Sequence, residues 1–469
     1  MQEPDALFSA LRRSADPRAA DALERLVREG EDRNLNRINA LDFAARHGLR
    51  EEAAIGALLH ASRLGIFDMA WNVLCPGCGG VLDATATLKS VQHDHYNCAL
   101  CAAGYEPTLD EMVEVVFTVS PRVRRIAAHD PHSLPPIEYF RQILWGSGVD
   151  LPQDGFEELI DEIMIDSLEL PAGERGVMSV QLPSEFVIVF EPVTHSALFL
   201  DVQGEPTRER RQISLVFNKV QSPTGTQVMQ PGPLRIALDN RTDTRVLPSV
   251  WIAADPLHNL LGRRKPFLTA RRLLSNQTFR DLYQTDTLNV DQRLKITSLT
   301  FLFTDLRGST ELYERVGDLV AFDLVRSHFR VLLDIVAEES GAVIKTIGDA
   351  VMATFLSPEQ AVSAALRMRE GMRAFNAAHG RDDLSLKIGI HEGPCLAVLL
   401  NERQDFFGQT VNMASRVQGV ANSTAIVVSD QIAKDKSTAG LLERSGLAPI
   451  ARQTALRGLA HEVTLYEIP

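Results

Sequence analysis

FLFTDLRGST, at residues 301–310, is the stretch that decides the expected fold of the C-terminal part of the chain. The apolar run at its start predicts a strand, and Asp305 stands where that run ends. The Gly-Ser-Thr turn that follows offers backbone amides beside the carboxylate, which suits a hydrated divalent cation and phosphate groups. An Asp before Gly and Ser is also common as a turn or helix cap, so this stretch alone leaves both interpretations open.

Two further stretches extend the pattern. In IKTIGDAVMATF, residues 344–355, a tight glycine turn places Asp349 between two apolar strands. Two carboxylates on neighbouring strands can share two metal ions about 3.5–4 Å apart, as in-line displacement at phosphorus requires. In DFFGQTVNMASR, Asn412 and Arg416 are four apart on one face of a predicted helix, where an amide and a guanidinium can orient a ribose and hold a phosphate oxygen. Each stretch alone also fits a plain hairpin turn or a solvated helix face.

Residues from about 296 to 469 alternate strands and helices. A long amphipathic helix over 321–340 precedes the hairpin of 342–355, and 384–400 is typical of a strand pair that includes Cys395 as a core residue. This order, with a hairpin in mid-sequence, favours an α+β fold with helices on one side of a mostly antiparallel sheet.

Together the three stretches match in type, order and spacing, and residues 296–469 resemble the class III adenylate and guanylate cyclase catalytic domain. The resemblance implies that Asp305 and Asp349 bind two Mg²⁺ or Mn²⁺ ions per active site, with the backbone carbonyl of Leu306 as a further ligand. The metals would lower the pKa of the ribose 3′-hydroxyl and neutralise charge on the triphosphate.

The resemblance also implies roles for five other residues. Lys345 and Asp405 match the pair that reads the base, Asn412 the amide that orients the ribose, and Arg416 the arginine that stabilises charge on the α-phosphate. Arg457 stands where a basic residue holds the outer phosphates, although lysine is more usual there.

Substrate choice follows from this base-reading pair. Adenine has an acceptor at N1 and a donor at its 6-amino group, which match Lys345 as donor and Asp405 as acceptor, whereas guanine presents the reverse pattern. A buried mismatch of this kind can discriminate by about 10⁴ to 10⁵. We therefore expect an adenylate cyclase that converts ATP to 3′,5′-cyclic AMP and pyrophosphate. A cyclase for GTP or a pyrimidine triphosphate, and a catalytically silent nucleotide-binding regulator, are the alternatives.

The resemblance further implies a homodimer. The family uses the positions of Lys345 and Asp349 in different sites, the acid from one subunit and the base reader from its partner. A two-fold pair of catalytic domains then forms two equivalent sites, and this chain contains every residue that they need.

Four of the five cysteines form two Cys-x-x-Cys pairs, namely Cys75, Cys78, Cys98 and Cys101. Four thiolates at this spacing predict a tetrahedral, structural Zn²⁺ site of the zinc-ribbon kind. A redox dithiol, or a site that uses His93 or His95, are the alternatives.

The chain has 469 residues and a formal net charge of −13. This charge argues against a protein that coats nucleic acid or anionic lipid, because neither polyanion attracts it at long range. No apolar run approaches the roughly 20 residues of a membrane helix, and the N-terminus lacks the apolar centre of a signal peptide. We expect a cytoplasmic protein without a membrane or nucleic-acid partner.

The sequence predicts five segments in an α+β multidomain chain: a helical module at 1–74, a zinc-ribbon-like segment at 75–106, a β-sandwich-like regulatory domain at 107–262, a helical connector at 263–295 and the catalytic domain at 296–469. The first segment fits a winged-helix module or a plain helical bundle. Residues 1–295 look like the regulatory region ahead of some bacterial class III cyclases, which implies an unidentified regulatory ligand or protein.

Overall fold

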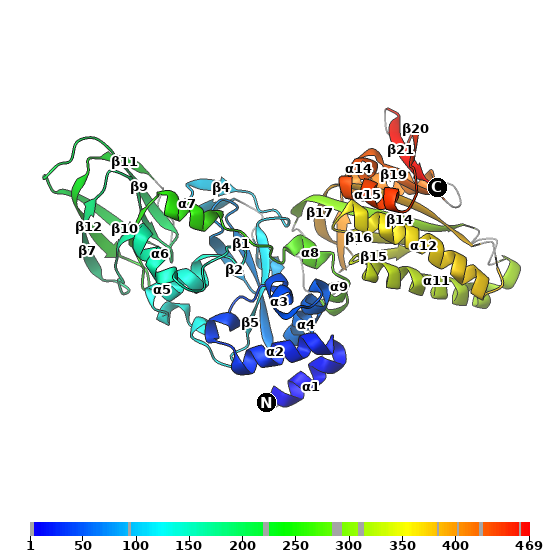
Figure 1. Cartoon of the computed structure of the whole chain (residues 1–469), viewed down its shortest axis with the longest axis horizontal. Helices are drawn as coiled ribbons and strands as arrows, with labels where there is room; N and C mark the ends of the chain where they lie inside the picture. The colour runs from blue at the N-terminus through cyan, green and yellow to red at the C-terminus, as the bar shows by residue number, and fades with distance from the viewer. Residues whose placement is uncertain are drawn as a thin grey trace. The chain divides into compact units, whose positions relative to one another are not determined.

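The computed structural model describes residues 4–91, 95–218, 225–283, 293–307, 314–381, 384–400, 403–421, 425–458 and 461–469. The chain divides into two compact units (Figure 1): unit 1 comprises Met1–Pro107 and Glu111–Thr269, and unit 2 comprises Thr108–Asp110 and Ala270–Pro469. Of the helices in the described ranges, none has the length and apolar character needed to cross a membrane.

Unit 1 begins with helices α1 (Pro4–Ser14), α2 (Pro17–Glu29), α3 (Ala40–His47) and α4 (Glu51–Arg63). Asp16 caps α2 by accepting from the Ala19 amide, and Gly48 ends α3 in the left-handed conformation that glycine adopts without steric cost. Strand β1 (Phe67–Leu74) follows α4 after a short turn. The choice between a winged-helix module and a helical bundle stays a prediction.

β1 is the central strand of a three-stranded sheet with β2 (Val81–Thr85) and β5 (Val113–Val119). β5 falls within the segment predicted as the β-rich domain, yet it pairs antiparallel with β1 from Phe67 to Val73. The short strands β3 (Tyr96–Cys98) and β4 (Ala103–Tyr105) form a separate hairpin that carries the second cysteine pair.

The rest of unit 1 contains two sheets that share one hydrophobic core, as the sandwich-like pattern predicted. The sheets have the orders β10-β12-β7 and β11-β9-β8-β13-β6, with strands β6 (Met164–Ser167), β7 (Arg175–Leu182), β8 (Phe186–Glu191), β9 (Ser196–Val202), β10 (Arg211–Phe217), β11 (Thr226–Met229), β12 (Gly232–Asn240) and β13 (Ser249–Ile252). Met178 and Ile236 enter this core from one sheet, and Val187 and Leu200 enter it from the other. Helices α5 (Pro136–Tyr139), α6 (Phe156–Ile163) and α7 (Asp255–Gly262) complete the unit.

Unit 2 is built on one eight-stranded sheet of order β15-β16-β14-β17-β19-β21-β20, with β18 paired to β17 outside this path. Its strands are β14 (Leu294–Arg307), β15 (Ala342–Ile347), β16 (Ala350–Phe355), β17 (Ser385–Leu400), β18 (Arg403–Phe407), β19 (Ile426–Ser429), β20 (Ile450–Thr454) and β21 (Val463–Ile468). Its helices are α8 (Ala270–Leu274), α9 (Gln277–Leu282), α11 (Asp318–Glu338), α12 (Pro358–Ala378), α13 (Gln409–Gly419), α14 (Asp430–Lys434) and α15 (Lys436–Arg444). The β15–β16 hairpin and the mostly antiparallel sheet agree with the expected α+β fold.

Helices cover both faces of this sheet, which corrects the expectation of helices on one side only. α11 and α12 lie side by side over one face (Figure 1) and share a core with Leu302, Ile388 and Val428. α13 packs on the opposite face, where Val427 points away from that core. Gly389 makes this contact possible, because a Cβ there would lie 2.1 Å from the backbone nitrogen of Gln418.

Residues 384–400, expected as a strand pair, form the single long strand β17. The Pro394 position does not break the strand because it lies opposite a bulge in β14, between the pairs Ile296–Cys395 and Leu299–Gly393. A bulge leaves some backbone groups of the strand pair without a hydrogen bond. The N–H group that proline lacks is therefore not needed at this position.

Candidate active site and cysteine centre

Two carboxylates, Asp305 and Asp349, lie close enough for the charge of one to act on the other. Asp305 is near the end of β14, and Asp349 occupies the turn between β15 and β16, where Gly348 has a φ of +64°. Burial raises the pKa of Asp305, and the negative charge of Asp349 raises it further. The buried Oδ2 atom of Asp349 has no hydrogen-bond partner in the described part of the chain. Mutual repulsion and an unpartnered buried oxygen are both features that a bound cation would stabilise.

These residues fit the divalent cations that the sequence predicts. β16 pairs with β14 only as far as Thr304, so residues 305–307 are paired on the β17 side alone. Backbone carbonyl groups on the other side are therefore open to a ligand, and carboxylate and carbonyl oxygens are the donors that Mg²⁺ and Mn²⁺ prefer. The Leu306 side chain is buried and has no ligand atom, so only the backbone carbonyl of this residue can take part.

Lys345 and Asp405 meet on the same sheet. Lys345 comes from β15 and forms an ion pair with Oδ2 of Asp405 on β18. The other carboxylate oxygen, Oδ1, accepts from the Phe406 amide over 2.8 Å. Asp405 is buried and Lys345 half-buried, so one end of the pair is fixed while the ammonium group stays accessible. A donor and an acceptor side by side can recognise one edge of a purine.

Arg280, on α9, is a residue that the sequence analysis missed. Its Nη2 atom donates to the carbonyl of Ile344 over 3.2 Å and to the carbonyl of Gln404 over 3.0 Å. These residues immediately precede Lys345 and Asp405, so one guanidinium joins the two strands that carry the pair. Burial lowers the pKa of Arg280 to about 10, which leaves it charged at neutral pH. Its segment was predicted only as a connector, and no local motif marks an arginine that donates to carbonyl groups 64 and 124 positions away.

His328, on α11, is a second residue that the sequence did not single out. Its side chain is fully buried, and Nδ1 contacts the Val325 carbonyl over 3.0 Å. Nε2 has no partner among the described atoms. Burial lowers the pKa of His328, while the charge of Asp349 opposes that shift. On sequence grounds, a histidine in an apolar helix stripe is indistinguishable from a core residue.

Asn412 and Arg416 lie one turn apart on α13, as predicted. A Cβ on Gly458 would lie 3.3 Å from Nη2 of Arg416, so the backbone next to Arg457 passes close to this guanidinium. In the part of the chain described, no hydrogen bond or ion pair joins Asn412 or Arg416 to Asp305 or Asp349. The carboxylate pair and the α13 pair are thus not joined directly within the described chain.

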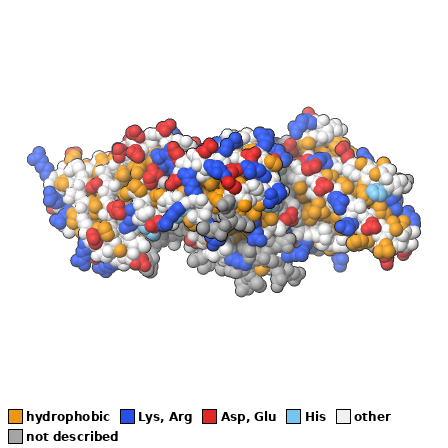
Figure 2. Space-filling view, turned by 90° about the horizontal axis from the view of Figure 1, so that it is seen from below, with side chains coloured by type: hydrophobic (Ala, Val, Ile, Leu, Met, Phe, Trp, Pro, Cys, Tyr) orange, Lys and Arg blue, Asp and Glu red, His pale blue; other side chains and the backbone are white. Residues whose placement is uncertain are grey.

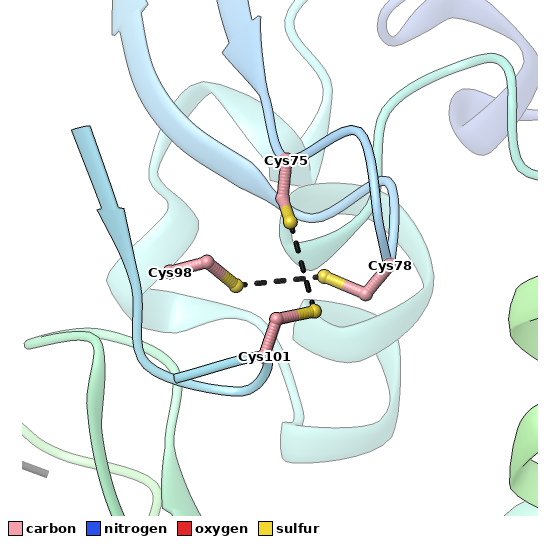
Figure 3. A group of neighbouring side chains, drawn as sticks. All are labelled: Cys75, Cys78, Cys98 and Cys101. Carbon is pink, nitrogen blue, oxygen red and sulfur yellow. Dashed lines mark hydrogen bonds between the residues drawn. The ribbon is translucent and has the colours of Figure 1, made fainter. Parts of the chain in front are cut away.

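The second centre consists of the four paired cysteines, which converge in unit 1 (Figure 3). All four Sγ atoms lie within 4.8 Å of one another. Cys75 and Cys101 are 3.7 Å apart at sulfur, and Cys78 and Cys98 are 3.6 Å apart. Sulfur atoms at about 2.3 Å from a tetrahedral Zn²⁺ would be separated by about 3.8 Å, so the thiols have the spacing of such a site.

The backbone around the sulfur atoms is shaped by two glycines. A Cβ on Gly77 would lie 3.1 Å from the Cys101 sulfur, and one on Gly80 would lie 3.2 Å from the Cys78 sulfur. The Gly80 amide also points at the Cys78 sulfur over 3.4 Å, the kind of outer contact that orients a thiolate ligand. The alternative with His95 is not favoured, because the described metal-ligand group does not include it, and His93 lies outside the described residues.

Comparison with proteins of known sequence agrees with this division. Residues 292–446 match the family model described as "Adenylate and Guanylate cyclase catalytic domain", and residues 1–281 match the "Family of unknown function (DUF5939)". An adenylate cyclase of Anabaena cylindrica is 27% identical over 185 residues, which are 36% of this chain and 36% of that protein. An adenylate cyclase of Streptomyces griseus is 32% identical over 162 residues, which are 34% of this chain and 35% of that protein.

The chain thus spans about a third of the length of the curated relatives that it matches. Among solved structures, the adenylyl cyclase CyaB from P. aeruginosa is 24% identical, with a TM-score of 0.34, and the match covers 38% of this chain and 96% of that one. Since the first family model covers more than half of the chain, the protein belongs to the DUF5939 family and carries a class III adenylate and guanylate cyclase catalytic domain in residues 292–446.

Proposed function

We propose that the protein converts ATP to 3′,5′-cyclic AMP and pyrophosphate at two sites shared between the catalytic domains of a homodimer. The observation that carries this proposal is the Lys345–Asp405 ion pair on the sheet that also holds Asp305 and Asp349. One group matches adenine and the other matches divalent cations, so the chain has both halves of a nucleotide site.

The base-reading step uses the ion pair. The accessible ammonium of Lys345 donates to adenine N1, and the carboxylate of Asp405 accepts from the 6-amino group. Because Asp405 is held by the Phe406 amide and its strand is joined to β15 by Arg280, its acceptor is fixed before the nucleotide binds. Guanine would place a donor against the lysine and an acceptor against the carboxylate, which leaves buried polar groups unpaired.

In the reaction, the 3′-oxygen forms a bond to the α-phosphorus, and the bond from that phosphorus to the bridging oxygen of pyrophosphate breaks. The proton of the 3′-hydroxyl passes to solvent or to the substrate phosphates. Divalent ions held by Asp305, Asp349 and the Leu306 carbonyl would supply charge neutralisation and a lowered hydroxyl pKa. Asn412 orients the ribose, Arg416 stabilises the charge that develops on the α-phosphate, and Arg457 binds the outer phosphates.

The proposed dimer is supported by how these groups are arranged. Within one chain, Lys345 lies on β15 shortly before the turn that contains Asp349, while no bond joins Asn412 or Arg416 to either carboxylate in the described residues. A two-fold partner would bring its α13 and its base-reading pair to the Asp305–Asp349 pair, and the reverse.

The test uses the purified full-length protein with Mn²⁺ and each of ATP, GTP, CTP and UTP, and measures cyclic nucleotide and pyrophosphate by mass spectrometry. Cyclic AMP as the main product supports the proposal. Lys345→Glu, which replaces a donor by an acceptor, should lower the ATP rate by about 10² or more while it spares binding of the metal.

Three other results would overturn parts of the proposal. Cyclic GMP or a cyclic pyrimidine nucleotide as main product would replace ATP as the substrate. A protein that binds nucleotide but releases no pyrophosphate from any of the four would be a nucleotide-binding regulator. A protein that turns over as a monomer at every concentration in light scattering would contradict the shared sites.

We also infer that the cysteine centre holds a structural Zn²⁺. Four thiols at tetrahedral spacing leave no position for a substrate, and three of the four cysteines are buried. The metal would stabilise the fold of unit 1, because structural zinc sites contribute folding free energy directly.

A further inference from the structure

Unit 1 contains a cavity of about 260 Å³ that neither the cyclase reaction nor the cysteine centre uses. Its lining comes from two segments, residues 33–47, which include α3, and residues 141–153. Leu26 and Lys265 complete the lining. This volume is close to the lower end of small-molecule sites, about 300 Å³, so it suits a small metabolite and not a polymer.

The lining carries five cations and one acid. The cations are Arg33, Arg37, Arg46, Arg141 and Lys265, and the acid is Asp42. The chain as a whole is strongly acidic, and on the face shown in Figure 2 acidic and basic side chains are interspersed. A gathering of cations in a hollow is therefore a local feature that needs its own explanation.

Four of these cations already have acidic partners. Arg46 lies 2.8 Å from Asp42, and Arg33, Arg141 and Lys265 each lie within 4.0 Å of a carboxylate. Arg37 differs, because it forms no salt bridge to any described residue. Its only side-chain hydrogen bond in the described chain goes from Nη1 to the Ile143 carbonyl over 2.6 Å.

Arg37 is also held in an unusual conformation. Its φ is +48°, a left-handed value that non-glycine residues seldom adopt. Its amide donates to the Thr118 hydroxyl over 3.1 Å, which fixes the residue to β5. Burial lowers the pKa of Arg37, and the negative charge of Glu114 opposes that shift. Both carboxylate oxygens of Glu114 already accept hydrogen bonds, from Asn72 and Ser147, so Arg37 has no salt bridge of its own and can bind an anion in the cavity.

The remaining lining tells which anion would fit. Leu26, Ile38, Phe43, Val149 and Leu151 also line the cavity, and we call this apolar part of the lining its apolar wall. An inorganic ion would leave that wall in contact with water, whereas an organic anion would cover it. The planar fork of a guanidinium binds phosphate oxygens bidentately, and several nearby cations suit a dianion better than a single carboxylate.

We propose that this cavity is a binding site for a small organic phosphate, with Arg37 as the residue that binds the phosphate group. The site would give the N-terminal unit a ligand of its own, independent of the proposed cyclase reaction.

The test is calorimetry and tryptophan fluorescence on the full-length, metal-loaded protein, since Trp145 lines the cavity. The probes are glycerol 3-phosphate and glucose 6-phosphate, with inorganic phosphate as the minimal anion and citrate as a carboxylate. Nucleotides are left out because they can bind the proposed active site. We expect saturable binding of a phosphate ester, one per chain, with a Kd below about 1 mM.

Two matched variants connect this binding to Arg37. Arg37→Gly removes the guanidinium at a φ that glycine adopts freely, so the fold should persist, as a melting curve will verify. Arg50→Gly removes the same group from an exposed helix N-cap outside the cavity, where glycine is tolerated. We expect a Kd at least about tenfold weaker for the first and unchanged for the second. Arg37→Lys, which keeps the charge but loses the fork, should fall between them.

Three outcomes would overturn the proposal: no saturable binding of either ester, an equal Kd in Arg37→Gly, or binding of citrate alone. Asp349→Ala should bind the phosphate ester with the wild-type Kd, although it should lose cyclase activity. Loss of ester binding and loss of cyclase activity can therefore be distinguished.

Discussion

The two candidate metal centres are built in opposite ways. In unit 1, four thiols lie within 4.8 Å of one another, and three of these cysteines are buried. In unit 2, two half-buried carboxylates repel each other, and one oxygen of Asp349 has no partner in the described chain. The first arrangement fills every position around a metal with protein, whereas the second leaves most positions to water and substrate.

This difference shows how function can be separated from stability within one chain. A closed centre gains from its metal during folding and has little reason to release it. An open centre keeps charges that the fold alone does not satisfy, so we expect its metal ions to bind together with the nucleotide phosphates. We expect changes in the closed centre to appear mainly in stability and changes in the open centre mainly in turnover.

The largest expected effect is on turnover. Asp349→Ala should lower kcat/KM for ATP by about 10³ or more, because a carboxylate that holds the metal is lost. The melting temperature in EDTA should not fall, since the substitution removes a buried oxygen without a partner. Asp334→Ala, at an exposed position on α11, is the matched control and should change neither. An Asp349→Ala protein with wild-type rates would remove this carboxylate from the open centre.

The closed centre should give the reverse pattern. Cys78→Ser should reduce bound zinc from one per chain to nearly none and lower the melting temperature of unit 1 by about 10 °C or more. Cys395→Ser is a matched control, because Cys395 is also buried but lies on β17, outside the cluster. Zinc content by atomic emission and melting by calorimetry are the measurements. Retention of zinc in the Cys78 variant would contradict the four-thiolate site.

The Lys345–Asp405 pair is intermediate between the closed centre and the open centre, because protein donors already bind the Asp405 carboxylate. Arg280→Ala should raise the KM for ATP by about tenfold and reduce the preference for ATP over GTP, because the two strands lose a charged donor between them. We expect a smaller change in kcat. Arg326 is exposed on α11, and Arg326→Ala should leave the KM for ATP and the preference for ATP over GTP unchanged. A fall in kcat alone would assign Arg280 to the reaction and not to base positioning.

The smallest effect concerns stability without metal. The pKa of Asp305 is raised in the fold, so its charged form is disfavoured there relative to the unfolded chain. The penalty is present above the folded-state pKa and disappears below the unfolded value near 4. Asp305→Asn should therefore raise the melting temperature in EDTA at pH 7 slightly, with the difference vanishing as the pH approaches about 4. With Mn²⁺ the order should reverse, since only the carboxylate binds the ion.

Sequence reasoning found the parts that depend on short-range patterns. The hairpin around Asp349, the helix that carries Asn412 and Arg416, and the spacing of the four cysteines were all predictable, because turn residues and helical periodicity determine them locally. The catalytic-domain family, predicted for residues 296–469 from the resemblance of three stretches, is confirmed by the match over residues 292–446. The roles of the individual site residues stay predictions.

Long-range contacts were the part that sequence reasoning missed. The Arg280 guanidinium acts on carbonyl groups far along the chain, and β5 pairs with β1 across the cysteine segment. α13 lies on the second face of the sheet because Gly389 leaves room for it, which a pattern of apolar residues cannot reveal. Likewise, Pro394 is tolerated in β17 only because a bulge in another strand lies opposite.

The hairpin between β15 and β16 couples the two proposed sites of the dimer. Lys345 precedes Asp349, in the tight turn, by four residues, yet the proposed dimer uses the two residues in different sites. A nucleotide that orders Lys345 at one site would also fix the metal-binding carboxylate of the other. Occupation of the two sites would then be cooperative, with a Hill coefficient that differs from one and a second turnover that depends on whether the first product has left.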